Sequence, residues 1–172
     1  KFKEVINQLD IWDNWRKSYN KYVPQFIEEA RKGENWETWN KDVFYEFFTK
    51  GGDQCVASLK QGYFTNQEKQ LIKDNWDKIA PLLKQIADNQ EEPQYGIYNQ
   101  LKKTLQTYTS LDRKAATNRM IASLQPNLLC TIVNEKSLYQ LFAYLKQNIE
   151  EKIPDCIAGD WFKNSYNIWK FY

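Results

Sequence analysis

The sequence predicts an all-α protein, a compact multi-helix domain of about seven to nine helices with at most one short strand. Apolar residues recur every three or four positions along most of the chain, which is the spacing of one helix face. Only 6 glycines and 5 prolines are present, too few for the many tight turns of a sandwich or barrel. The hydrophobic content of 42%, with 16% aromatic residues, is enough for a sizeable core. We expect a single domain over residues 1–172.

The first third of the chain holds three segments that we expect to be helical. Residues 11–31 carry a regular apolar stripe, and Pro24 within it predicts either a kink or two consecutive helices. Residues 36–50 are rich in Trp and Phe, and Gly51-Gly52 is expected to end this helix because glycine adopts the left-handed turn freely. Residues 53–60 predict one more short helical segment.

The middle third begins with the clearest local signal in the sequence. Thr65 and Glu68 have the spacing of a capping box, in which each side chain bonds the free backbone N–H of the other residue. The apolar stripe over 71–86 predicts two helices, with Pro81 near the start of the second, where its missing N–H costs nothing. A further helix is expected to open at Pro93 and to extend to about Tyr108.

Three more segments complete the expected fold. Asp112 is expected to cap a helix that ends before Pro126. The apolar run over 128–133 contains β-branched residues and is the best candidate for a short strand. Asn134 is expected to cap a leucine-rich helix, and a final helix is expected to begin near Asp160.

The residue types present argue against a catalytic centre in this chain. It contains no histidine, which excludes Ser-His-Asp and Cys-His nucleophilic systems and histidine-based metal sites. The glycine-rich phosphate loops GxxxxGK[ST] and GxGxxG are also missing. Cys55, Cys130 and Cys156 are widely spaced and odd in number, so we expect free thiols. We therefore expect no catalytic residue, no metal and no cofactor.

Free thiols also indicate a reducing compartment, and we expect a cytoplasmic protein. No apolar stretch approaches the about 18 residues of a membrane-spanning helix, and nothing at the start resembles a signal peptide. We expect no membrane partner. The chain begins at Lys1 without Met and stops at Tyr172 inside an amphipathic run, so we expect a fragment of a longer polypeptide. The oligomeric state is left open.

The distribution of charge suggests one candidate binding segment. The net charge is +2, so no global field attracts nucleic acid or membranes. Residues 102–119 are nevertheless locally basic, with five basic residues against one acidic residue, Asp112. Two helix ends meeting at such a turn could offer cations, hydroxyls and N–H groups to a phosphate backbone, whereas the alternative is an ordinary solvated lysine face. The five candidates are Lys102, Lys103, Arg113, Lys114 and Arg119.

Two other features leave room for a protein partner. Residues 28–46 hold six acidic and three basic residues, so the surface is expected to be polarised, which suits protein–protein contact. Aromatic residues also gather near the C-terminus, where they either complete the core or form a surface for a partner. These are Trp161, Phe162, Tyr166 and Trp169.

The segment Leu111–Asn134, followed by the helix over 138–145, resembles a stretch upstream of the motor in McrB-like proteins. These are the GTP- or ATP-driven AAA+ subunits of bacterial modification-dependent restriction systems. The shared features are a basic helix ending in Asn118-Arg119, a break at Pro126 and the run that begins at Thr131. The resemblance implies an N-terminal specificity domain that binds DNA, in some members recognising a modified base. It also implies a motor domain downstream, where the missing phosphate loop would lie.

The leading hypothesis from the sequence is a non-catalytic DNA-recognition domain of a restriction-type AAA+ NTPase, which contacts DNA through residues 102–119. The rival hypothesis is a helical protein–protein interaction or oligomerisation domain that uses the C-terminal aromatic residues. The possible partners are therefore DNA, the downstream motor domain of the same chain, or another protein.

Overall fold

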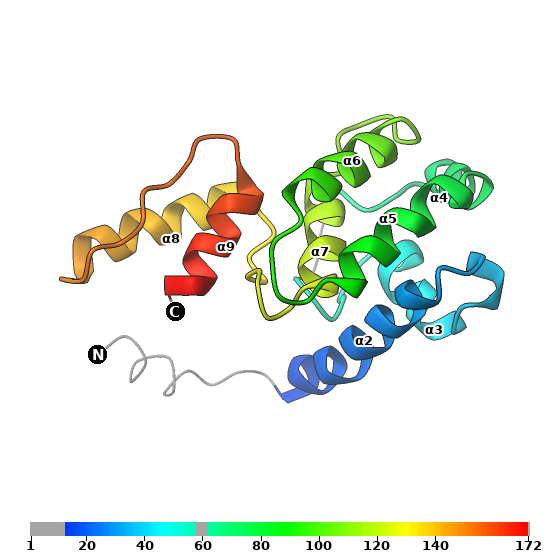
Figure 1. Ribbon diagram of the computed structural model, residues 1–172, viewed down its shortest axis with the longest axis horizontal. Coiled ribbons are helices and arrows are strands. Elements are labelled where there is room, and N and C mark those ends of the chain that lie inside the picture. Colours follow the sequence, from blue (N-terminus) through cyan, green and yellow to red (C-terminus); the bar gives the residue numbers. More distant parts are fainter. Residues whose placement is uncertain (1–12, 58–61, 172) are drawn as a thin grey trace.

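The computed structural model describes residues 13–57 and 62–171, and these residues form eight α-helices and no β-strand. The prediction of an all-α fold is confirmed (Figure 1). In chain order the helices are α2 (Asp13–Lys32), α3 (Lys41–Phe44), α4 (Asn66–Asp74), α5 (Trp76–Asp88), α6 (Tyr95–Gln106), α7 (Lys114–Leu124), α8 (Glu135–Asn148) and α9 (Trp161–Phe171). A 3₁₀ turn, η1 (Trp36–Thr38), precedes α3, and a π-helical turn, η2 (Tyr45–Thr49), follows it.

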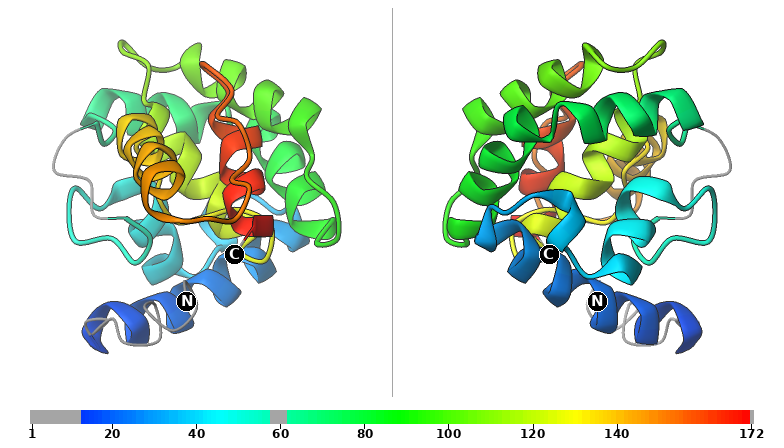
Figure 2. Two further views of the ribbon diagram at one scale, coloured as in Figure 1. Left: turned by 90° about the vertical axis from the view of Figure 1, so that its left-hand side faces the viewer. Right: turned by 90° about the vertical axis from the view of Figure 1, so that its right-hand side faces the viewer.

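The helices form a main body and a smaller C-terminal pair. Helix α5 packs between α2 and α6, and α7 contacts all three of these helices. Helices α8 and α9 pack on each other beside this body, to its left in Figure 1. Helix α9 lies between α8 and the body and contacts α6, as Figure 2 shows from two further sides.

Aromatic side chains from α2 to α5 form much of the core of the main body. The Phe26 and Phe47 rings stack with centroids 3.8 Å apart, and the Trp39 ring meets Trp76 edge to face at 5.2 Å. Trp39 and Trp76 are both buried, as expected from their positions on apolar stripes. Burying one such side chain stabilises the fold by about 1.5–3 kcal/mol, so this cluster fixes the ends of α2, α3 and α5 together.

Pro24 was expected to produce a kink or to separate two consecutive helices, and Pro81 was expected to lie near the start of a helix. Helix α2 runs without interruption through Pro24, and α5 includes Pro81 in its interior rather than near its start. Both proline rings are exposed. The carbonyl that each proline leaves without an N–H donor therefore lies toward solvent, where water can bond it. The free energy gained by packing α2 and α5 then outweighs the one backbone hydrogen bond that each helix loses.

The Trp- and Phe-rich segment over 36–50 was expected to be one helix, but it is divided into three short turns. Asn40 starts α3 afresh because its side chain accepts hydrogen bonds from the backbone N–H groups of Asp42 and Val43. The π-helical turn then widens the helix, and Glu46, Phe47 and Phe48 are all buried. Such turns are rare and occur frequently at functional sites.

The segment 53–60 was expected to be helical. Its described part, 53–57, is irregular, and Asp53 and Ala57 have positive φ angles of 48° and 52°. The remaining residues of this expected helix lie outside the described residues. The positive angles explain why no helix can pass through 53–57.

Two expectations in the last third also need correction. Asp112 does not cap α7, since the N-cap position is taken by Arg113 and no side chain bonds the first turn. The run 128–133 forms no strand. Its backbone instead bonds to side chains: Trp161 Nε1 donates to the Ile132 carbonyl at 2.9 Å, and Asn118 Nδ2 donates to the Val133 carbonyl at 3.1 Å.

Two other predicted caps are confirmed. Thr65 and Glu68 form the complete capping box at the start of α4. The Asn134 side chain accepts a hydrogen bond from the Ser137 N–H at the start of α8. Among the helices of the described residues, none is both long enough and apolar enough to cross a membrane.

Candidate functional site

The basic segment predicted to contact DNA lies on α6, on α7 and on the loop between them. Lys102 and Lys103 are on the second half of α6, while Lys114 and Arg119 are on α7. Arg113 immediately precedes α7. Because α6 and α7 pack together, the five residues come from one region of the fold. Their side chains, however, have different surroundings.

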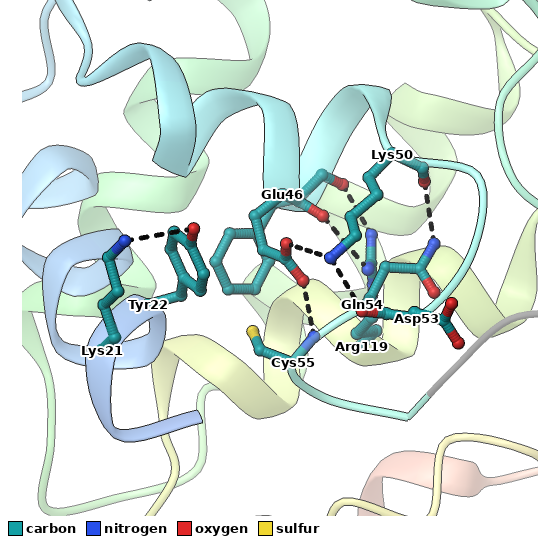
Figure 3. Close-up of polar contacts among 9 residues, drawn as sticks. Lys21, Tyr22, Glu46, Lys50, Asp53, Gln54, Cys55 and Arg119 are labelled. Carbon is teal, nitrogen blue, oxygen red and sulfur yellow. Dashed lines mark hydrogen bonds and ion pairs between the residues drawn. The ribbon is translucent and has the colours of Figure 1, made fainter. Parts of the chain in front are cut away.

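Arg119 belongs to the core and not to the surface. It is 2% exposed, and its Nη1 and Nη2 donate to the carbonyls of Glu46 and Phe47 at 3.3 and 2.8 Å (Figure 3). Its guanidinium also lies 5.7 Å from the centre of the Phe47 ring. Burial lowers the pKa of Arg119 to about 10, so the group stays charged at neutral pH. Arg119 is therefore enclosed by the fold and does not lie on the surface, where the sequence analysis placed it.

The two carbonyls that Arg119 binds belong to the π-helical turn. The Glu46 side chain, in the same turn, bonds residues of the segment 50–55 that follows it. The Glu46 carboxylate accepts the Cys55 backbone N–H at 2.5 Å and the Lys50 ammonium at 2.9 Å. Lys50 in turn donates to the Asp53 carbonyl at 2.8 Å. Burial raises the pKa of the Cys55 thiol to about 12, so this cysteine is an unreactive core residue.

Arg113 also forms an ion pair within the fold, with Glu68. Its Nε and Nη2 donate to the two carboxylate oxygens of Glu68 at 3.1 and 3.0 Å. The same carboxylate accepts the Thr65 N–H at 2.8 Å and both the N–H and hydroxyl of Ser110 at 2.9 Å. Burial alone would raise the pKa of Glu68, but these hydrogen bonds outweigh it and hold the pKa at about 2.

The Glu68–Arg113 pair therefore joins the start of α4 to the start of α7. Its side chains are 4% and 12% exposed, and Nε and Nη2 of the guanidinium both bond this one carboxylate. Arg113 is therefore mostly buried and paired within the fold, unlike the exposed Lys103 and Lys114 of the segment. Sequence reasoning could not find this pair, since its members are 45 positions apart.

The other three basic residues of the segment remain near the surface. Lys103 is exposed and Lys102 is half-buried, and neither forms an ion pair with any residue in the described ranges. Lys114 is exposed and lies 3.5 Å from the Glu135 carboxylate, at the long end of the ion-pair range. We define Lys102, Lys103 and Lys114 as the lysine surface.

A cleft of about 250 Å³ adjoins the lysine surface. It lies where α6 and α7 face the chain that leads into α9. Lys102 lines it, together with the buried amide of Asn118 and the carboxylate of Glu135. The other lining residues are Asn99 and the stretch 157–162. A polar cleft of this kind, next to unpaired cations, is the clearest candidate site in the described part of the chain.

The predicted aromatic surface is mostly core. Trp161 and Phe162 are 3% and 5% exposed, and Tyr166 is half-buried. Only Trp169 is well exposed, at 41%, and its Nε1 donates to the Asn127 carbonyl. Sequence reasoning missed Tyr144, which is 61% exposed on α8. Its position outside the leucine stripe of that helix was the available signal.

The acidic segment over 28–46 is partly internal. Glu29 and Glu46 are buried, while Glu28, Glu34 and Asp42 are exposed. Glu34 also lines an open groove of about 400 Å³ between the end of α2 and helices α4 and α5. The described residues contain no group of three or more Cys, Asp or Glu side chains placed to hold a metal ion.

Comparison of the chain with protein-family models, with curated proteins and with solved structures finds no match.

Proposed function

We propose that this domain is a non-catalytic nucleic-acid recognition module, which binds DNA through the lysine surface. The observation that carries the proposal is that the three lysines lie on the second half of α6 and at the start of α7, two helices that pack together, and that Lys102 also lines a polar cleft. Two of them, on Lys102 and Lys103, have no carboxylate partner among the described residues. Unpaired lysines can neutralise phosphates and release counterions without first breaking an internal ion pair.

In this proposal Arg113 and Arg119 position the surface rather than touch DNA. Arg113 holds the start of α7 to Glu68, and Arg119 holds its middle to the π-helical turn. Rigid placement matters because a cation that is already oriented loses less conformational entropy on binding. Lysines act as point charges, so the contacts expected here are to phosphates and carry little base specificity.

The first test removes the three cations together. We expect the Lys102→Ala, Lys103→Ala, Lys114→Ala variant to bind duplex DNA at least tenfold more weakly than the parent in a gel-shift titration at low salt, because each lost phosphate contact removes counterion release. The matched control replaces three exposed lysines elsewhere, Lys21, Lys41 and Lys78, and so changes the net charge equally. An equal loss of DNA affinity in both triple variants would contradict a localised binding surface.

The resemblance to McrB-like proteins extends this proposal to a biological setting. The domain would act as the specificity domain of a restriction-type AAA+ NTPase in the cytoplasm, with its motor downstream in the same protein. The support is the basic α7 segment that ends in Asn118-Arg119 and the break at Pro126. A GxxxxGK[ST] loop in the sequence that follows Tyr172 would agree with this setting, and an unrelated downstream domain would contradict it.

A second candidate function is protein–protein interaction through the α8–α9 pair. The specific observation is that this pair carries three large exposed aromatic side chains, Tyr139, Tyr144 and Trp169, of the kind enriched at interfaces. We expect this function to appear as a concentration-dependent dimer in light scattering, weakened by Trp169→Ala. Tyr45→Ala, which removes an exposed aromatic ring from η2, is the control and should leave the dimer intact. A monomer at every concentration would count against self-association.

A further inference from the structure

The segment 50–57, which follows the π-helical turn, has a strained backbone. Asp53 and Ala57 have φ angles of 48° and 52°, and in the described part of the chain they are the two non-glycine residues with positive φ. A side chain in this left-handed region is unfavourable because its Cβ lies too close to a backbone carbonyl oxygen. Such strain persists only where surrounding contacts enforce it, and it is concentrated in segments that move or bind.

The contacts that enforce this conformation depend largely on one buried carboxylate. Glu46 is 2% exposed, and its side chain accepts the Cys55 N–H at 2.5 Å and the Lys50 ammonium at 2.9 Å. Lys50 in turn donates to the Asp53 carbonyl at 2.8 Å (Figure 3). The Gln54 side chain donates to the Lys50 carbonyl, also at 2.8 Å. Loss of the Glu46 charge would therefore weaken two of these bonds directly and a third through Lys50.

The same conformation leaves a buried donor without an acceptor. Arg119 is 2% exposed, and its Nη1 and Nη2 bond carbonyls of the π-helical turn, but its Nε has no partner among the described residues. The Cys55 thiol, 1% exposed, lies near this guanidinium (Figure 3). A buried donor without an acceptor costs free energy, which is regained when water reaches it. Movement of the segment away from Arg119 would allow this.

From these observations we infer that residues 50–57 form a strap that opens as a unit while the helices stay folded, and that the Glu46 carboxylate holds the strap closed. The closed state contains two strained residues and one unpaired donor, so opening the strap requires less free energy than unfolding the domain. The two states present different groups to the solvent: the closed strap encloses the Cys55 thiol and the Arg119 guanidinium, and the open strap exposes both. This conformational switch does not depend on DNA binding.

The test is the rate at which iodoacetamide labels Cys55 in the 172-residue chain, measured on the Cys55 peptide by mass spectrometry. We expect labelling through local opening, so the rate should hardly change in urea concentrations below the global unfolding transition, because opening exposes little surface. A labelling rate that rises with urea as steeply as the global unfolding equilibrium would overturn the inference, since Cys55 would then be reached only in the unfolded chain.

A pair of matched variants tests the role of Glu46. Glu46→Gln should raise the labelling rate of Cys55 at least tenfold in the absence of urea, because it removes the charge that bonds Lys50 and the Cys55 N–H. The control is Glu68→Gln, which alters the other buried carboxylate that is paired with a cation. It destabilises the whole domain without touching the strap, so the labelling rate should stay within about twofold of the parent. Equal acceleration in both variants would overturn the inference.

A third variant tests the strain itself. Ala57→Gly should slow the labelling of Cys55 at least threefold, because glycine adopts a φ of 52° without strain and so favours the closed strap. This change leaves every side-chain bond to Glu46 in place. An unchanged or faster rate would show that the backbone of the closed strap is not strained at Ala57, and would contradict the switch.

Discussion

Replacing Glu68 with alanine should lower the free energy of unfolding by about 3–5 kcal/mol, the usual cost of removing one partner from a buried ion pair. The change leaves the Arg113 guanidinium without its carboxylate, and it removes the acceptor of Ser110 and of the Thr65 N–H. Urea denaturation measures the loss directly. Glu91→Ala, which removes an exposed loop carboxylate, should change the stability by less than about 0.5 kcal/mol.

The pH dependence of stability gives an independent check on the same pair. The pKa of Glu68 is about 2 in the folded protein, against an ordinary value of 4.5. Its ionised form therefore contributes stability that is complete above about pH 4.5 and is lost as the pH falls toward about 2. Glu68→Gln has no such titration, so the stability difference between parent and variant should shrink over this range. A difference that stays constant would show that Glu68 is not held in its ionised form.

Replacing Arg119 with methionine, a side chain of similar length, should destabilise the protein by about 3 kcal/mol, since each buried carbonyl left without a donor costs on the order of 1–3 kcal/mol. The two carbonyls belong to Glu46 and Phe47 in the π-helical turn. Arg119→Lys keeps the positive charge but lacks the planar guanidinium fork that bonds both carbonyls at once. Its free energy of unfolding should therefore lie between those of the parent and of Arg119→Met.

The control for this series is Lys103→Met, which removes a cation from an exposed position of α6. It should leave the urea midpoint nearly unchanged. A loss below about 1 kcal/mol for Arg119→Met would mean that water or a relaxed backbone satisfies the two carbonyls, and that the guanidinium does not hold the turn in place.

Local signals in the sequence predicted the fold class and most helix positions. The capping box of Thr65 and Glu68 and the cap of Asn134 depend on residues within three positions of each other, so a single sequence contains all the information. Pro24 and Pro81 do not divide their helices, because the packing of α2 and α5 outweighs the backbone hydrogen bond that each proline removes. Whether Pro24 is exposed depends on which face of α2 packs on α5 and α7, and that is decided by tertiary structure.

The candidate site was predicted only in part, for a related reason. The basic segment was correctly placed at the junction of two helices, but charge counting cannot separate a buried arginine from an exposed lysine. One usable signal was present: residues 116–124 of α7 are mostly small or apolar, and all are buried. A helix that is apolar nearly all round lies inside the fold, which predicts an internal role for Arg119. The cleft depends on contacts between segments far apart in the sequence and had no local signal.

The most direct test of the DNA-recognition proposal is fluorescence anisotropy with duplex DNA across a salt series, using unmodified, cytosine-methylated and adenine-methylated duplexes. Each phosphate contact contributes a slope of about −0.9 to the plot of log affinity against log salt, so loss of the lysine surface should reduce the slope of the parent by roughly 2 to 3. We expect salt-dependent binding by the parent and this reduction in the Lys102→Ala, Lys103→Ala, Lys114→Ala variant. No binding of any duplex at low salt, or an equal slope in parent and variant, would contradict DNA recognition by this surface.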